Sequence, residues 1–224
     1  MIKTKKNYLF LFLILFSVYC AVSIGQAWDE GHLLLQGKIV AKYLLSLGNI
    51  NEEIFIREYY SPIYYSLKYL FIQIFPIKYQ IEANHLTNLF FSLCTIIGIK
   101  KLSKELFNDK VGIIVFLILF FYPAFNGHMG FNSKDTILAL CHVWIFYLSI
   151  KYLKYQHNKK KINNYINYIA ILAAVGSGIN LYFLGSLLPL FIFLILDFYI
   201  FKKIKSKKFD TKRLIINLLY GFLV

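Results

Sequence analysis

Residues 8–24 read YLFLFLILFSVYCAVSI, an apolar run of the length that crosses a membrane as one helix. A bilayer core about 30 Å thick needs roughly 20 such residues. Lysines precede the run, as they do in signal peptides, and the small residues near Gly25 and Ala27 would suit cleavage. Because the run is long for a signal core and further apolar runs follow, we expect an uncleaved span.

The composition of the whole chain agrees with this reading. Of its 224 residues, 58% are hydrophobic and only 16% are charged, whereas soluble domains have about 45–50% apolar and about 25% charged residues. We therefore predict an all-α polytopic membrane protein with about seven transmembrane helices. Beyond the first run, the predicted spans are His85–Ile99, Val111–Phe125, Thr136–Leu153, a hairpin within Tyr165–Phe201 that turns near 182–186, and a last span from Leu214.

The net charge of +14 does not indicate a nucleic-acid partner. The basic residues lie between apolar runs rather than on one polar face, and only Arg57 and Arg213 are arginines. The three cysteines sit inside apolar runs, without a disulfide or metal-binding spacing.

The basic residues predict the topology. Nineteen of the 25 fall in the N-terminus and in the loops 100–110, 151–164 and 202–213. Since cytoplasmic loops carry an excess of Lys and Arg, these segments should be cytoplasmic. Segments 26–84 and 126–135 should face outward, into the periplasm if the membrane is a bacterial inner membrane.

The first outer segment contains two predicted amphipathic helices. Apolar residues recur at helical spacing over 30–47, and a second run begins after Pro62 and covers 63–75. Both are typical of helices that lie along the membrane interface. A plain connector between two spans is the simpler interpretation.

Three clusters place polar residues next to the apolar runs, where apolar residues would cost less free energy to bury. The first is Trp28-Asp29-Glu30, directly after the first span, where an interfacial Trp and a helix cap are the alternative. The second, 127–135, reads GHMGFNSKD, and a turn with Ser133 or Asp135 as a helix cap would also explain it. The third comprises Glu82, Asn84, His85 and Asn88, of which the last two share a helix face.

These motifs and their order resemble the GT-C class of membrane glycosyltransferases, in particular the branch of protein O-mannosyltransferases and aminoarabinose transferases. WDEG resembles the family's acidic pair after the first span, and YYSPIYYSL its proline and aromatic segment. HLTNLFFSL resembles the start of its second span, and PAFNGHMGFNSKDTILAL its GHxxFNPKD pattern. Ser133 stands where the family has proline, and Tyr182 stands near an expected arginine.

The resemblance implies an inverting transfer of a sugar from a polyprenyl-phosphate donor to a lipid, glycan or protein acceptor. Asp29 would act as the catalytic base, with Glu30 supporting it. The remaining implied site residues are Lys134, His128 and Asn132 at the donor phosphate, Asp135 at a divalent metal, and Tyr64, His85 and Asn88 along the site. Membrane lipids would be partners.

Family members are about twice as long, so we expect the single module 1–224 to continue past Val224. Two other functions stay open. One is a transporter or flippase-like protein, although the intramembrane polar residues are few: His142, Asn180 and Asp197. The other is a non-catalytic, degenerate transferase.

Overall fold

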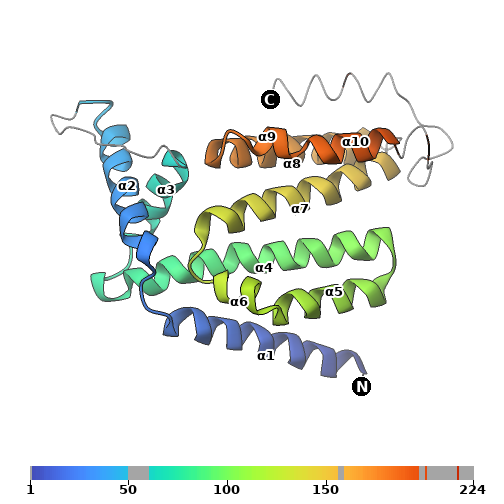
Figure 1. Ribbon diagram of the computed structural model, residues 1–224, viewed down its shortest axis with the longest axis horizontal. Coiled ribbons are helices and arrows are strands. Elements are labelled where there is room, and N and C mark those ends of the chain that lie inside the picture. The colour runs from blue at the N-terminus through green and yellow to red at the C-terminus, as the bar shows by residue number, and fades with distance from the viewer. Residues whose placement is uncertain (1, 50–60, 156–158, 197–199, 201–215, 217–224) are drawn as a thin grey trace. The chain divides into compact units, whose positions relative to one another are not determined.

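The computed structural model describes residues 2–49, 61–155, 159–196, 200 and 216. These residues form helices and no strand, which confirms the all-α prediction (Figure 1). The helices are α1 (Ile2–Ser23), α2 (Trp28–Leu45), α3 (Pro62–Ile72), the 3-10 helix η1 (Ile77–Tyr79), α4 (Gln80–Leu106), α5 (Asp109–Phe121), α6 (Pro123–His128), α7 (Ser133–Lys154), α8 (Lys159–Ile179), α9 (Phe183–Ser186) and α10 (Leu188–Leu196).

The chain divides into two compact units. Unit 1 contains residues 1–94 and 119–136, and unit 2 contains 95–118 and 137–224. Helices α4, α5 and α7 contribute residues to both units. The prediction of a single module stays a prediction.

Two helices are long and apolar enough to cross a membrane by themselves: Ile77–Leu106, which joins η1 to α4, and α7. Helices α1 and α2 satisfy the same criteria together but are bent by 82°, so the described residues provide two or three candidate spans. These helices make the chain an integral membrane protein. About seven spans are not confirmed, because α5 and the apolar segments Asn164–Ile179 and Phe183–Ile192 are shorter than a span, and the predicted span from Leu214 lies almost entirely outside the described residues.

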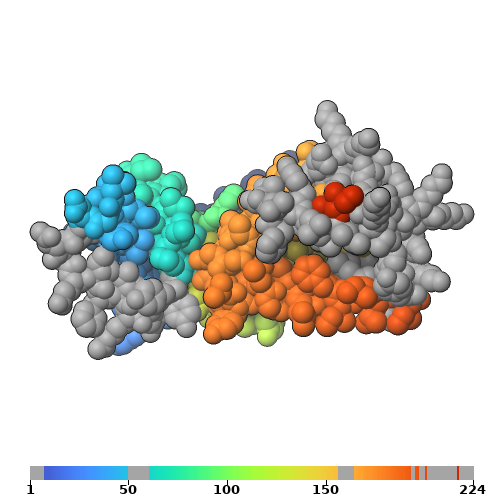
Figure 2. Space-filling model, turned by 90° about the horizontal axis from the view of Figure 1, so that it is seen from above, coloured from blue at the N-terminus to red at the C-terminus, as the bar shows by residue number. Residues whose placement is uncertain are grey.

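In unit 1, α2 packs against α3 through small residues (Figures 1 and 2). Gly37 and Ala41 are buried, and a Cβ on Gly37 would lie within 3 Å of the main-chain carbonyl of Tyr65. The apolar residues predicted for this helix differ in exposure: Val40 is buried, Leu33, Leu34 and Ile39 are half-buried, and Tyr43 and Leu44 are exposed. Small residues allow backbones to approach closely, as they do between helices in membranes.

In unit 2, the ends of α4 and α7 meet through ion pairs. Glu105 lies 2.5 Å from Lys151 Nζ and 2.8 Å from Lys154 Nζ. The loops 100–110 and 151–164, both predicted to be cytoplasmic, therefore begin at the same end of this unit.

The predicted hairpin in the C-terminal apolar stretch appears in unit 2 as a break between α8 and α9. Asn180 Oδ1 accepts a hydrogen bond from the main-chain N–H of Tyr182, 3.0 Å away. Phe183 packs on Gly176, where a Cβ would lie 2.5 Å from the ring. His142 on α7 contacts Ser186 with 2.6 Å between Nε2 and Oγ.

Candidate functional site

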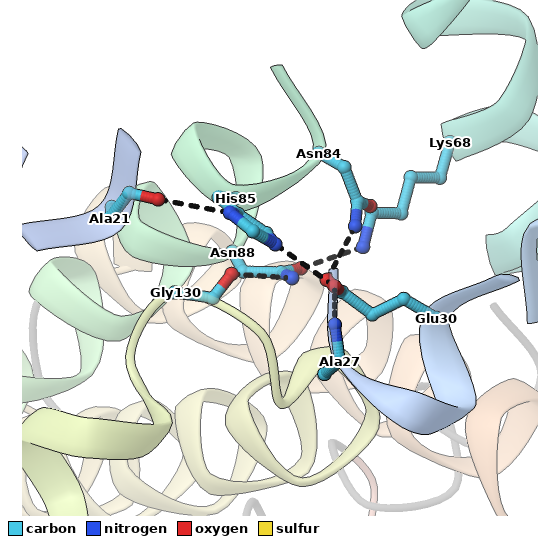
Figure 3. A network of polar contacts seen from close by, with 8 residues as sticks. All are labelled: Ala21, Ala27, Glu30, Lys68, Asn84, His85, Asn88 and Gly130. Carbon is cyan, nitrogen blue, oxygen red and sulfur yellow. Dashed lines mark hydrogen bonds and ion pairs between the residues drawn. The ribbon is translucent and has the colours of Figure 1, made fainter. Parts of the chain in front are cut away.

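The candidate site in unit 1 centres on the carboxylate of Glu30, in the first turn of α2 (Figure 3). Glu30 is only 4% exposed. One oxygen accepts a hydrogen bond from Asn84 Nδ2 at 2.7 Å, and the other lies 2.8 Å from the Ala27 main-chain N–H and 2.9 Å from His85 Nε2. The bond to Ala27 is the carboxylate half of a capping box. Both oxygens of Glu30 are thus engaged within the protein.

His85 joins this carboxylate to the end of α1. Its Nδ1 lies 2.9 Å from the Ala21 carbonyl oxygen, which can only accept, so Nδ1 carries a proton. On the other side, Nε2 faces Glu30. The contact needs one further proton, on Nε2 or on the carboxyl group. His85 and Glu30 therefore share a proton in a fully buried place.

Lys68 lies close enough to this network to feel the charge of Glu30, and it was not predicted from the sequence. It lies on α3, is 4% exposed, and donates from Nζ to Asn88 Oδ1 at 2.8 Å. Burial lowers the pKa of the Lys68 ammonium from 10.5 to about 7, while the negative charge of Glu30 acts to raise it. The available signal was that Lys68 is the single charged residue of PIYYSLKYLFI.

The network extends from α4 to the second outer loop, 127–135. Asn88 Nδ2 donates to the Gly130 carbonyl at 2.9 Å, and Ser92 Oγ donates to the Met129 carbonyl at 3.1 Å. Side chains of α4 therefore hold two successive carbonyls of the loop that precedes α7.

Within that loop, Asn132 caps α7, rather than Ser133 or Asp135. Its Oδ1 accepts from the Asp135 main-chain N–H at 3.4 Å, and its Nδ2 donates to Asp135 Oδ2 at 3.0 Å. His128 Nδ1 lies 3.5 Å from the same amide. Asn132, Asp135 and His128 therefore gather on one turn, with His128 and Asp135 exposed and Lys134 half-buried.

The Tyr65 hydroxyl connects the two outer segments through a hydrogen bond. Tyr65 is buried, and its hydroxyl lies 3.1 Å from Ser133 Oγ. Burial raises the pKa of Tyr65, the Ser133 hydrogen bond lowers it, and the negative charges of Asp135 and Asp29 raise it further. Both carboxylates thus lie close enough to act on one hydroxyl, although 106 positions separate them in the sequence.

Asp29 and Tyr64 complete the predicted set. Asp29 is exposed at the start of α2. The Tyr64 ring packs at 5.3 Å from the Tyr65 ring, and Lys68 Nζ lies 5.8 Å from its centre. Burial raises the pKa of Tyr64. Among the described residues its buried hydroxyl has no hydrogen-bond partner.

The described side chains that could ligate a metal bear on the divalent metal predicted at Asp135. Within the described part of the chain, no three His, Cys, Asp or Glu side chains converge as metal ligands. Asp135 already accepts a hydrogen bond from Asn132. A divalent metal at Asp135 stays a prediction.

The fold and this site define a helical integral membrane protein in which carboxylates from two loops act on the same buried tyrosine. The chain belongs to the family described as dolichyl-phosphate-mannose-protein mannosyltransferase, whose family model matches residues 61–224. Membership confirms the resemblance to GT-C glycosyltransferases, a family that uses polyprenyl-phosphate-linked sugars. Asp29 and Glu30 precede the matched segment. No curated protein and no solved structure matches the chain.

Proposed function

We propose that this chain transfers a sugar, with inversion at the anomeric carbon, from a polyprenyl-phosphate donor to a lipid, glycan or protein acceptor. Family membership supports the class of reaction. The observation that carries the proposal is the difference between two adjacent acids. Glu30 is buried with both oxygens engaged, whereas Asp29 is exposed. Asp29 is therefore the better candidate for a base that meets an acceptor.

In the proposed reaction, the Asp29 carboxylate takes the proton of the acceptor hydroxyl as its oxygen attacks the anomeric carbon. The bond between this carbon and the phosphate oxygen breaks, and its electron pair leaves with the polyprenyl phosphate. Attack from the face opposite the leaving group inverts the configuration. Lys134, His128 and Asn132 would stabilise the departing phosphate through charge and hydrogen bonds.

This mechanism requires the two outer segments to converge. A base works within about 2.6–3.2 Å of the proton that it removes, so the loop at the leaving group must lie close to Asp29. The electrostatic effect of both Asp29 and Asp135 on the Tyr65 hydroxyl supports this convergence. The hydrogen bond between Tyr65 and Ser133 supports it independently.

We also propose the membrane arrangement predicted from the sequence: about seven spans, a cytoplasmic N-terminus and an outward site in a bacterial inner membrane. The 82° bend between α1 and α2 suits a span followed by a helix at the interface. The ion pairs of Glu105 with Lys151 and Lys154 suit two loops on one side.

The decisive experiment compares Asp29→Asn with the parental chain. The chain is reconstituted in liposomes with a polyprenyl-phosphate sugar, and sugar transfer is measured. Asn keeps the shape of Asp and removes the base, so the rate should fall by roughly 10²–10⁴, with an unchanged melting temperature. Glu30→Gln should slow transfer less but lower the melting temperature, because a buried charged network loses its carboxylate.

Asp109→Asn is the matched control, because it makes the same exchange at an exposed position near the basic end of α4. It should transfer sugar at the parental rate. An Asp29→Asn variant that keeps the parental rate would return Asp29 to the role of a helix-end residue. A parental chain without any transfer would favour the non-catalytic alternative.

The transport alternative gains no support from the polar residues considered for it. His142 Nδ1 lies 2.8 Å from the Leu138 carbonyl, and its Nε2 contacts Ser186. Asn180 accepts from the N–H of Tyr182. Both side chains therefore have hydrogen-bond partners within the protein, while Asp197 lies outside the described residues.

A further inference from the structure

A second chain of polar contacts in unit 1 has no role in the proposed reaction. It runs from Lys68 on α3, through Asn88 on α4, to the main-chain carbonyl of Gly130 (Figure 3). Lys68 and Asn88 are at most 4% exposed. Burying a lysine in an otherwise apolar helix is costly unless it is paired. The contacts of Lys68 should therefore have a purpose that an apolar side chain could not serve.

The chemistry of the amide gives the Lys68 contact a direction. Asn88 has one end that only accepts and one end that only donates. The Gly130 carbonyl can only accept and the Lys68 ammonium can only donate, so a single orientation of the amide satisfies both while Lys68 is protonated. A rotation by 180° would set Nδ2 against the Lys68 ammonium and Oδ1 against the carbonyl. Lys68 and the Gly130 carbonyl thus together fix which end of Asn88 faces the loop.

The loop held in this way carries the residues assigned to the donor phosphate. Gly130 lies two positions before Asn132 and four before Lys134. Ser92, one helical turn after Asn88, holds the neighbouring Met129 carbonyl. These bonds fix the main chain of the loop against α4 without using any side chain of the loop.

We propose that Lys68 and Asn88 are positioning residues for the donor. Lys68 locks the Asn88 amide, and Asn88 holds the loop at Gly130, so that Asn132 and Lys134 meet the phosphate of the polyprenyl-phosphate sugar. This inference rests on the proposed function. It adds to that function two residues that affect donor binding without touching the donor.

Asn88→Asp tests the proposal with almost no change of shape. The carboxylate still accepts from Lys68 but presents an acceptor, not a donor, to Gly130. Lys68→Met removes the donor to Asn88 Oδ1, and Lys68→Arg keeps a positively charged donor there. Thr87→Val is the matched control one residue away on α4, because the Thr87 hydroxyl donates to the Ala83 carbonyl of its own helix.

Two measurements on the full chain in detergent or liposomes keep this inference separate from the proposed function. The first is amide hydrogen exchange over 127–135, which needs no activity. Exchange there should quicken roughly tenfold in Asn88→Asp and Lys68→Met, in line with one lost buried hydrogen bond. The exchange rate over 127–135 should equal the parental rate in Thr87→Val and should lie close to it in Lys68→Arg.

The second measurement is the kinetics of transfer. The KM for the polyprenyl-phosphate sugar should rise roughly tenfold in Asn88→Asp, with kcat within about threefold of the parental value. Unchanged exchange over 127–135 would overturn the positioning role. Exchange that quickens evenly along α4 and α7 would also overturn it, because the bond would then support the whole fold. A parental chain that transfers no sugar refutes only the proposed function, and the exchange result still decides the role of Lys68 and Asn88.

Discussion

At the scale of single residues, Glu30 and Lys68 illustrate two ways of keeping a charged group in an apolar surrounding. Glu30 receives hydrogen bonds from Ala27 and Asn84 and shares a proton with His85. Lys68 makes its hydrogen bond to Asn88 and is attracted by the charge of Glu30. Burial outweighs this attraction for Lys68, so its ammonium form is disfavoured in the folded protein. Stability should therefore depend on pH.

The sign of this dependence follows from the lowered pKa of Lys68. Between pH 7 and 10.5 the unfolded chain binds a proton that the folded chain does not, so stability rises with pH across this window. The destabilisation is fully present below about pH 7. The melting temperature in detergent should rise by several degrees from pH 7 to 9. Lys68→Met should remove most of this rise, and an equal rise in that variant would show that another group is responsible.

The sequence identified part of this network. The spacing of His85 and Asn88 predicted a common helix face, and both reach the site region. Lys68 was missed because a single lysine in an amphipathic helix normally marks the solvated face. Tyr65 was missed because nothing in YYSPIYYSL distinguishes the tyrosine that contacts Ser133 from its neighbours. Such contacts join segments far apart in the chain, and periodicity describes only near neighbours.

At the scale of helices, the contact between α2 and α3 depends on the absence of a side chain at Gly37. A Cβ there would approach the Tyr65 carbonyl and lie 3.2 Å from Tyr69 Cβ, and the carbonyl is backbone that cannot rotate away. Gly37→Ala should therefore separate the two helices and cost about 1–3 kcal/mol. The measurement is the melting temperature of the purified chain.

Gly178→Ala in α8 is the matched control, because a Cβ there meets nothing within 4 Å. It should be neutral or slightly stabilising, since alanine favours helix over glycine. Equal melting temperatures for Gly37→Ala and the parental chain would show that α2 and α3 do not need their close approach.

The sequence predicted the presence of helices well where apolar runs are long. It predicted the residues at which those helices end less well. The run Val111–Phe125 was taken as one span, but α5 ends at Phe121 and a short helix starts at Pro123. Proline disfavours a helical conformation in the residue before it, and Tyr122 accordingly has an extended backbone. The pairing of α2 through Gly37 and Ala41 was not predicted, because glycine and alanine carry little hydrophobic signal.

At the scale of the whole molecule, the distribution of basic residues predicts the orientation. Single cysteines at Asn51 and Ser206, in a variant without Cys20, Cys94 and Cys141, should react with an impermeant thiol reagent from opposite sides of the membrane. Asn51 should react from outside and Ser206 from the cytoplasm. Reaction of both from the same side would contradict the topology.

The family could be inferred from the sequence because its motifs lie in a fixed order along the chain. The family model begins at residue 61 and therefore supports the segments around Pro62 and Ser133 more directly than the acidic pair. The resemblance suggested separate roles for Asp29 and Glu30, and the structure adds that Asp29 is exposed whereas Glu30 is buried. Composition alone would have assigned them the same role.

The contact between His85 and Ala21 can form only some seconds after Ala21 has been synthesised. The Ala21 carbonyl belongs to the last turn of α1, where carbonyls lack a partner within the helix, and its partner is made 64 residues later. At about 5–20 residues per second, a nascent chain would wait several seconds between these two events. Throughout that interval the end of α1 and the Glu30 carboxylate must be satisfied by water. The first outer segment should therefore remain at the membrane surface until the translocon delivers α4, and only then can Glu30 leave water.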